Sequence, residues 1–200
     1  MLAVGTSKLL LRTSPVNYWH LRSAVRILEN GGIICYPTEG CYGLGCNPYD
    51  GQTVIRLLDI KHRPLSMGLV LIASNFNQLE PLLAPLPKQR LAQVQATWPG
   101  PVTWSWPCVP EAPKWLTGDH ETLAVRITAH PLANALCKAF DGPLISTSAN
   151  ISGHPPARTA LRVHHIFNQR VDYILHGELS GRKRPTEIRD ALTGRALRRG

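Results

Sequence analysis

The chain has 200 residues, 44% of them hydrophobic, which is enough for one sizeable core but leaves little length for a second domain. Its 22 Lys and Arg residues against 13 Asp and Glu residues give a net charge of +9, which predicts a surface that attracts polyanions, either RNA or nucleotide phosphates. No segment approaches the length of a membrane span, and the apolar run at residues 9–11 is too short for a secretory signal. The five cysteines are odd in number and scattered, which favours a reducing cytoplasm over a disulfide framework.

The first predicted helix covers residues 17–29, because apolar side chains recur there at helical spacing and a pair of glycines then stops the pattern. These apolar side chains are Tyr18, Leu21, Val25 and Leu28. A strand is predicted at residues 33–36, and it ends at Pro37, which cannot donate to a sheet ladder. A second helix is predicted over residues 52–61, because Pro64 prevents it from extending much further.

Strand-like runs recur along the rest of the chain, with helical patterns between several of them. They cover residues 68–73, 102–106, 123–127, 143–146 and 171–175. This interleaving predicts a mixed α/β sheet rather than a bundle of helices. We also expect part of the basic tail, residues 177–200, to pair back onto the sheet.

Lys61 and Arg63 are the first candidate ligand-binding residues. The usual glycine-rich nucleotide signatures are missing, so a phosphate site must be built differently. Two fixed cations at a helix end can hold a polyphosphate through charge-assisted hydrogen bonds. The alternative is a solvated basic helix end, which the helix dipole favours.

A second candidate is the polar run at residues 146–150, which follows an apolar strand at the edge where open α/β sheets bind ligands; turn formation is the alternative. Arg126 lies within an apolar strand, and a buried arginine there needs an anionic partner unless it faces solvent. Glu39 and Tyr42, in the turn after the first strand, can position a small polar ligand, although turn polarity alone also accounts for them.

The spacing of Cys35, Cys41 and Cys46 does not match a zinc site, and the histidines do not complete one, so we expect no protein metal cluster. Trp104 and Trp106 occupy alternate positions of a predicted strand. This favours a packed core face over a platform for stacking bases.

Several short motifs, each weak alone, occur in an order that resembles the YrdC/TsaC family over residues 17–200. They are Tyr36-Pro37-Thr38-Glu39, Tyr42-Gly43-Leu44-Gly45, Lys61-His62-Arg63-Pro64, Trp98-Pro99-Gly100-Pro101-Val102-Thr103, Ala124-Val125-Arg126 and Ser146-Thr147-Ser148-Ala149-Asn150-Ile151-Ser152-Gly153. The short length and the ending Glu187-Ile188-Arg189-Asp190 look like the bacterial TsaC form. The resemblance implies an N-terminal segment at residues 1–16 and one YrdC-like catalytic domain at residues 17–200, with a twisted mixed sheet and flanking helices around a concave basic cavity.

The resemblance also implies an activity, threonylcarbamoyl-AMP synthase. The substrates would be L-threonine, bicarbonate or CO2, and ATP with Mg²⁺, and the products would be L-threonylcarbamoyladenylate and pyrophosphate. The adenylate would serve modification of tRNA next to the anticodon, together with the pathway proteins TsaB, TsaD and TsaE. Such a cytoplasmic nucleotidyltransferase would act by positioning and charge neutralisation, without a protein nucleophile.

The resemblance further assigns individual residues. Those implied to contact ATP are Lys61, Arg63, Thr122, Ser148, Asn150 and Arg198. Those implied to lie near threonine or the carbamate are Thr38, Arg126, Ser146 and Thr186. Catalysis would fall to Lys61, Arg63 and Arg126. Gly40 and Met67 depart from the residues that relatives often carry at these places.

Two other functions compete with this one. The charge of +9 also suits a non-catalytic domain that binds double-stranded RNA, tRNA or rRNA, and such a module would spread its cations over an exposed face with accessible aromatic side chains. The enzyme would instead gather its cations in one pocket. A related carbamoyl-adenylate enzyme of hydrogenase maturation would need further domains, which 200 residues cannot hold.

Overall fold

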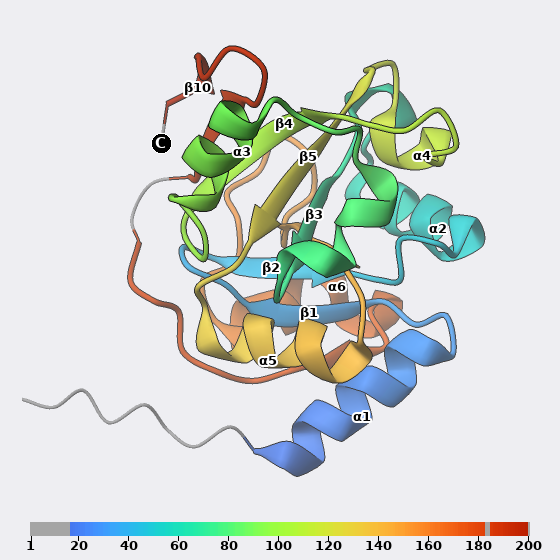
Figure 1. Cartoon of the computed structure of the whole chain (residues 1–200). Helices are drawn as coiled ribbons and strands as arrows, with labels where there is room; N and C mark the ends of the chain where they lie inside the picture. The colour runs from blue at the N-terminus through green and yellow to red at the C-terminus, as the bar shows by residue number, and fades with distance from the viewer. Residues whose placement is uncertain (1–16, 183–184, 200) are drawn as a thin grey trace, which may run out of the picture.

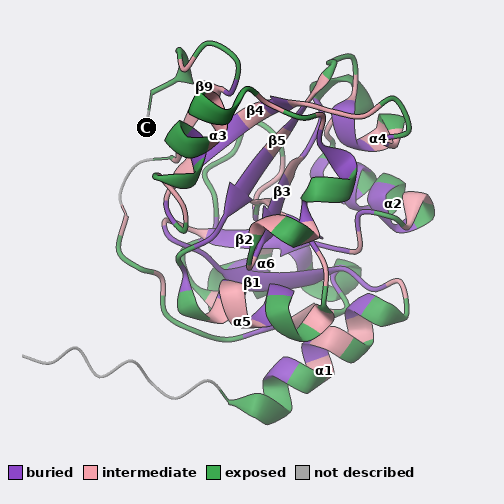
Figure 2. Cartoon of the chain, in the orientation of Figure 1, coloured by how far each residue is buried: buried purple, intermediate pink, exposed green. Residues whose placement is uncertain are grey.

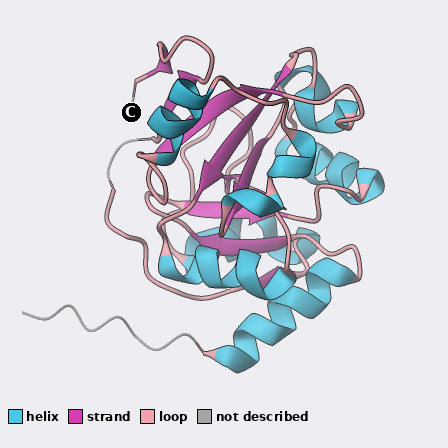
Figure 3. Ribbon diagram, in the orientation of Figure 1, coloured by secondary structure: helices cyan, strands magenta, loops and turns pink. Residues whose placement is uncertain are grey.

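The computed structural model describes residues 17–182 and 185–199 (Figure 1). The N-terminal segment expected at residues 1–16 lies outside the described residues. The α/β class is confirmed, since helices flank strands along the whole described chain (Figure 3). The strands form two separate sheets, however, where the sequence pattern suggested one.

Helix α1 (Tyr18–Glu29) begins where Asn17 caps it, and the Asn17 Oδ1 accepts hydrogen bonds from two backbone N–H groups of the first turn. The helix ends at a glycine with a φ of +71° and packs its buried residues against α5 (Pro131–Phe140). Tyr18, expected on the apolar face, is exposed instead. The first turn of α1 is exposed, and the buried face of the helix begins only at Leu21.

The four-stranded sheet has the order β7-β2-β1-β8. Its strands are β1 (Ile34–Pro37), β2 (Tyr42–Gly45), β7 (Thr147–Ser148) and β8 (Tyr173–Ile174). β1 pairs antiparallel with β2 and parallel with β8, and β2 pairs antiparallel with β7. Tyr42 was expected in a turn but is the first residue of β2. A side chain at Gly45 would collide with the Ile145 carbonyl oxygen, so the close approach of this strand requires glycine.

The six-stranded sheet has the order β10-β9-β4-β5-β3-β6. Its strands are β3 (Val70–Ala73), β4 (Val102–Pro107), β5 (Thr122–Ile127), β6 (Leu144–Ile145), β9 (Glu187–Asp190) and β10 (Ala196–Arg198). β9 pairs parallel with β4, and β10 pairs antiparallel with β9. The basic tail therefore pairs back onto the sheet, as the sequence predicted.

Helices cover the outer faces of the two sheets (Figure 1). The remaining α-helices are α2 (Gly51–Lys61), α3 (Lys88–Gln95), α4 (Lys114–Thr117) and α6 (Ala160–Phe167). Short 3-10 helices lie at Leu65–Met67, Phe76–Gln78, Glu80–Leu82 and Asn168–Arg170. Within the described part of the chain, none of the helices combines the length and the apolar composition that a membrane crossing requires.

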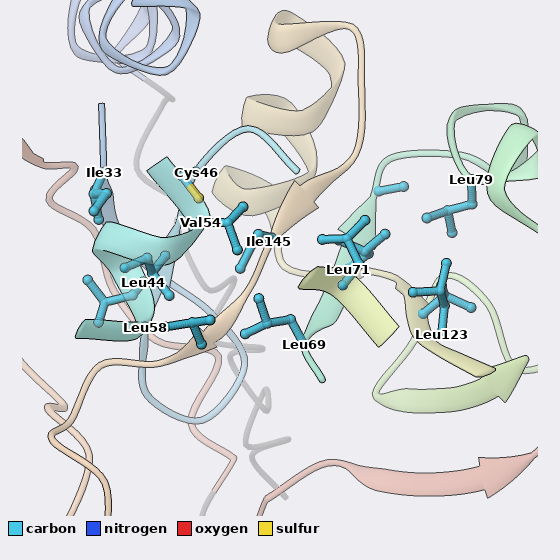
Figure 4. Close-up of a cluster of buried hydrophobic side chains, with 14 of the residues drawn as sticks. Ile33, Leu44, Cys46, Val54, Leu58, Leu69, Leu71, Leu79, Leu123 and Ile145 are labelled. Carbon is cyan, nitrogen blue, oxygen red and sulfur yellow. The ribbon is translucent and has the colours of Figure 1, made fainter. Parts of the chain in front are cut away.

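Strands β1, β2 and β6 are fully buried and β3 and β5 are mostly so, whereas β8 and β9 are half-buried and β10 is exposed (Figure 2). One cluster joins residues from both sheets and α2, including Leu44, Val54, Leu71 and Leu123 (Figure 4). A second cluster lies between α1, α5 and β1. Trp104 and Trp106 are almost fully buried in the first cluster, which confirms that they face the core.

Candidate active site

Lys61 is the last residue of α2, and its side chain is buried with 2% of its surface exposed. The helix stops because His62 adopts a left-handed conformation with a φ of 50° and Pro64 follows. The Lys61 Nζ donates to the carbonyl oxygen of Asn150 at 2.8 Å and to that of Ser148. A solvated basic helix end, the alternative from the sequence, is therefore wrong for Lys61.

Burial also changes the acidity of this ammonium group. Removal from water, and to a smaller extent the nearby positive charge of Arg63, lower the pKa of Lys61 to about 8. The ammonium contacts carbonyl oxygens and, among residues 17–182 and 185–199, makes no ion pair with a carboxylate. An anion that bound beside Lys61 would therefore meet a positive charge that the carbonyl oxygens neutralise only in part.

The polar run after β6 is shaped around Lys61. Asn150 Nδ2 donates to the carbonyl oxygens of Ile151 and His154, at 2.9 and 2.7 Å, which fixes the side-chain amide. The Ser148 Oγ donates to Asn150 Oδ1 at 2.6 Å. Ser148 is exposed and Asn150 is half-buried, so a hydroxyl and an amide stand at the surface beside the buried ammonium.

Arg63 makes its hydrogen bonds to the turn that follows α2. Its Nη2 donates to the Gly68 carbonyl oxygen at 2.9 Å and lies 3.4 Å from that of Met67. Its Nε is buried and has no hydrogen-bond partner within the part of the chain that the structure describes. Lys61 therefore contacts the polar run at residues 148–150, whereas Arg63 braces the turn at Met67 and Gly68.

Arg126, on β5, is buried with 5% of its surface exposed. Its partner is Glu39, which is equally buried and follows β1; Arg126 Nη2 lies 3.2 Å from Glu39 Oε2. The expectation that a buried strand arginine needs an anionic partner is confirmed, and a solvated strand face is excluded for this residue. Desolvation alone would raise the pKa of Glu39, but the Arg126 charge and the Thr128 hydroxyl together lower it.

Arg198 lies on the same face of the six-stranded sheet as Arg126. Arg198 pairs with Ile188, and Ile188 pairs with Thr103. Because Trp104 pairs with Val125, Thr103 and Arg126 are the next neighbours in that ladder and share a face. The positive charge of Arg126 contributes to a lowered pKa of Arg198, after the larger effect of burial.

Thr186 and Thr122, which the resemblance also assigns to the site, lie close to these paired residues. Thr186 accepts a hydrogen bond from Arg198 Nη2 through its carbonyl oxygen at 2.9 Å, and its hydroxyl lies 3.5 Å from that of Thr103. Thr122 is at the start of β5, where its hydroxyl accepts from the Ser105 Oγ at 2.8 Å. These contacts place hydroxyl groups along one face of β4 and β5.

Thr38 and Ser146 meet across Gly43 of β2. A Cβ atom built on Gly43 would lie 3.2 Å from the Thr38 Cγ2 and 3.3 Å from the Ser146 Oγ. The Thr38 hydroxyl is turned inward and donates to the Cys41 carbonyl oxygen at 2.7 Å. Glycine at this position thus leaves room between the two residues that the resemblance placed near threonine.

The structure therefore brings the predicted residues into two groups. One group belongs to the four-stranded sheet and the chain around it, and comprises Thr38, Lys61, Ser146, Ser148 and Asn150. The other belongs to the six-stranded sheet, and comprises Thr122, Arg126, Thr186 and Arg198. A surface hollow of about 570 Å³ lies elsewhere, beside α1, and shares none of these residues. The concave basic cavity stays a prediction.

Thr128 and His130 were missed from the sequence. Thr128 donates to Glu39 Oε1 at 2.8 Å, and His130 caps α5. The local signal was a histidine before Pro131, which marks the start of a helix and says nothing of a ligand. Their link to Glu39 depends on contacts far apart in the sequence.

A family model for Sua5, YciO and YrdC proteins, described as "Telomere recombination", matches residues 26–200. The chain belongs to this family. The resemblance to YrdC proteins is thereby confirmed over most of the sequence.

Curated relatives within the Sua5/YciO/YrdC family are similar over almost their whole length. A protein of Coxiella burnetii named threonylcarbamoyl-AMP synthase is 51% identical over 178 residues, which cover 89% of this chain and 96% of that protein. A protein of the same name from Nitrosococcus oceani is 49% identical over 180 residues, covering 90% and 97%. Relatives of this length and identity share the arrangement of the whole domain.

The fold of this family member also matches solved structures. A structure of P. abyssi Sua5 complexed with L-threonine superposes with a TM-score of 0.81 and 32% identity. The match covers 86% of this chain and 51% of that chain, so this chain spans about half the length of that Sua5 protein. The mixed α/β architecture is therefore the one found in Sua5.

Proposed function

We propose that this chain is a threonylcarbamoyl-AMP synthase, which forms threonylcarbamoyladenylate and pyrophosphate from ATP, bicarbonate and L-threonine. The observation that carries the proposal is the 51% identity over 178 residues to a relative of that name. The geometry supports it, because two buried cations, Lys61 and Arg126, stand in separate polar surroundings suited to two different anionic groups. A protein that binds RNA without catalysis has no need to bury its cations.

The chemistry begins with a carbamate: the threonine amine forms a C–N bond to the carbon of bicarbonate, and one C–O bond breaks with loss of water. A carbamate oxygen attacks the α-phosphate of ATP, the bond to the β-phosphate oxygen breaks, and pyrophosphate leaves. Lys61 and Arg63 would neutralise phosphate charge, and Arg126 would hold the threonine carboxylate through its planar fork. The reaction needs no protein nucleophile, since alignment of the two substrates supplies most of the catalysis.

The other assigned residues would complete the two subsites. Contacts to ATP would include those from Thr122, Ser148, Asn150 and Arg198. Contacts to threonine or the carbamate would include those from Thr38, Ser146 and Thr186. Within the ranges that the structure describes, no three His, Cys, Asp or Glu side chains gather in a way that would hold a metal. Mg²⁺ would enter the site together with the ATP phosphates.

In this role the chain would be a cytoplasmic nucleotidyltransferase. Its adenylate would be passed to TsaB, TsaD and TsaE for transfer to tRNA. Direct contact with tRNA or double-stranded RNA belongs to the competing function, and a binding measurement on the same preparation separates the two.

We expect pyrophosphate release from ATP to require both bicarbonate and L-threonine. The reason is that the attacking oxygen belongs to the carbamate, which forms only when both are present. The measurement is pyrophosphate release with Mg²⁺ and ATP, with each of the other two substrates omitted in turn, and with L-serine in place of L-threonine. Release that does not depend on the amino acid would overturn the proposal.

We expect kcat/KM for ATP to fall as the pH rises through about 8, because burial gives Lys61 a pKa of about 8 and the neutral amine cannot pair with phosphate. The unfolded chain, whose lysine titrates near 10.5, binds more protons between about 8 and 10.5. The Lys61 contribution to the free energy of unfolding therefore rises over that window. Activity should fall between pH 7 and 9 without a drop in melting temperature at pH 8; a flat activity profile would refute this role.

A further inference from the structure

The two groups of site residues lie on different sheets, and an ion pair joins them. Glu39 follows β1 of the four-stranded sheet, and Arg126 lies on β5 of the six-stranded sheet. Both side chains are almost fully buried, so the pair is shielded from solvent and from salt. Any shift of one sheet against the other would pull this pair apart.

Two polar atoms of this ion pair make no hydrogen bond among the described residues. They are Glu39 Oε2 and Arg126 Nε, both buried, and the 3.2 Å contact between Nη2 and Oε2 is an ion pair. A buried pair that served stability alone would need these groups satisfied to offset its desolvation. Arg126 is therefore held in place by Glu39 while its Nε stays available to another anion.

Glu39 is itself held by a chain of hydrogen bonds. Its Oε1 accepts from the hydroxyl of Thr128, which is completely buried, at 2.8 Å. The same hydroxyl oxygen accepts from the backbone N–H of His130 at 3.2 Å. The Thr128 hydroxyl thus uses both its donor and an acceptor site to connect Glu39 with the start of α5.

His130 continues this chain of hydrogen bonds, and its contacts determine which ring nitrogen carries the proton. Its Nδ1 lies 3.3 Å from the backbone N–H of Ala133 and must accept, because an amide nitrogen only donates. The proton is therefore on Nε2, which donates to the carbonyl oxygen of Glu178 at 2.9 Å. Burial lowers the pKa of His130, which favours this neutral ring.

This network of hydrogen bonds ends at the segment of residues 177–182, where His130 contacts the Glu178 carbonyl oxygen. This segment leads from β8 in one sheet toward β9 in the other, and it is drawn in orange in Figure 1. Tyr42 donates to the Gly177 carbonyl oxygen at 2.8 Å, and the Arg182 N–H donates to the Glu39 carbonyl oxygen at 3.0 Å. Glu39 therefore contacts Arg126 through its side chain and the connecting segment through its backbone.

We propose that Glu39, Thr128 and His130 are positioning residues that lock the Arg126 guanidinium and the 177–182 segment into one arrangement. The identity of the anion at Arg126 rests on the proposed function. The coupling between the network and the segment does not, because it follows from the contacts alone.

Thr128→Val and Thr128→Ser form the first test. Valine has nearly the shape of threonine but lacks the hydroxyl, so Glu39 loses its donor; serine keeps the hydroxyl. We expect Thr128→Val to raise the KM for threonine about tenfold, with the KM for ATP changed less than twofold, since a net loss of one hydrogen bond of about 1.4 kcal/mol is tenfold. Thr128→Ser should restore most of the threonine KM. Equal effects of both variants on both substrates would overturn the proposal.

His130→Asn and His130→Gln form the second test, which needs no catalytic activity. The asparagine Oδ1 replaces Nδ1 as the cap of α5, but no atom replaces Nε2; glutamine extends a donor toward Glu178 instead. Hydrogen exchange of peptides spanning residues 177–182 should speed up about tenfold or more in His130→Asn, and less in His130→Gln. A melting curve checks that both variants fold. Unchanged exchange in His130→Asn would refute the coupling, whereas a wild-type protein that releases no pyrophosphate would refute only the proposed function.

Discussion

Replacing Lys61 with methionine is expected to lower kcat/KM for ATP by about a hundredfold or more. Methionine fills a similar volume without the charge, so the phosphates lose one preorganised donor in a site with little water. Removing such a donor costs roughly 3 kcal/mol of transition-state stabilisation. Steady-state kinetics at pH 7, where the ammonium is charged, measure the effect.

The same variant tests the structural role of the ammonium. Without it, the carbonyl oxygens of Ser148 and Asn150 lose a donor, and each unpaired buried acceptor costs about 1–3 kcal/mol. We therefore expect a clear loss of stability in urea denaturation. Lys138→Met, at an exposed position of α5, is the matched control and should change neither property. Wild-type turnover in the Lys61 variant would remove Lys61 from the site.

Local patterns were sufficient to predict the helices that position this site. The ends of α1 and α2 depend on Asn17, Gly31, His62 and Pro64, whose effects act within a few residues of the chain. The end of α2 in turn places Lys61 at the polar run after β6. The location of a candidate cation at a helix end was therefore predictable, because the signals for it are local.

The division of the strands into two sheets was not predictable. β2 contains two glycines in four residues, a composition that disfavours strands, and it forms because β1 and β7 supply partners on both sides. β7 is only two residues long and begins two residues after β6 ends in the other sheet. Which strands pair depends on packing across the whole domain, so a short stretch of sequence does not contain enough information to predict the pairing.

In the candidate site, too, the residue types were predictable from the sequence but the contacts between distant residues were not. A buried strand arginine predicted an anionic partner, and the partner exists, but nothing near Arg126 in the sequence points to Glu39. Likewise, the burial of Lys61 depends on the carbonyl oxygens of a loop almost ninety positions away. Residue types and motif order indicated the participants, whereas the contacts between them required the folded chain.

Arg126→Lys is expected to impair the use of threonine far more than that of ATP. Lysine keeps a positive charge for Glu39, so no buried carboxylate is left without its cation, but it lacks the planar fork that grips a carboxylate through two parallel hydrogen bonds. A hydrogen bond to a charged group is worth about 1.5–3 kcal/mol, so the KM for threonine should rise about tenfold to a hundredfold.

The control for this variant is Arg189→Lys on β9. Arg189 also pairs with a carboxylate, that of Glu187 at 3.0 Å, but this pair is partly exposed, and its change should alter stability by less than about 1 kcal/mol and leave both substrates unaffected. Titration of Arg126→Lys with ATP and with threonine, together with a thermal melt, separates three roles of Arg126.

If this variant binds only threonine more weakly, Arg126 holds the threonine carboxylate. If it binds ATP more weakly to the same extent, Arg126 contacts phosphate instead. Unchanged threonine binding with a lowered melting temperature would make Arg126 a purely structural tie between the two sheets, because the charge would then matter only to Glu39.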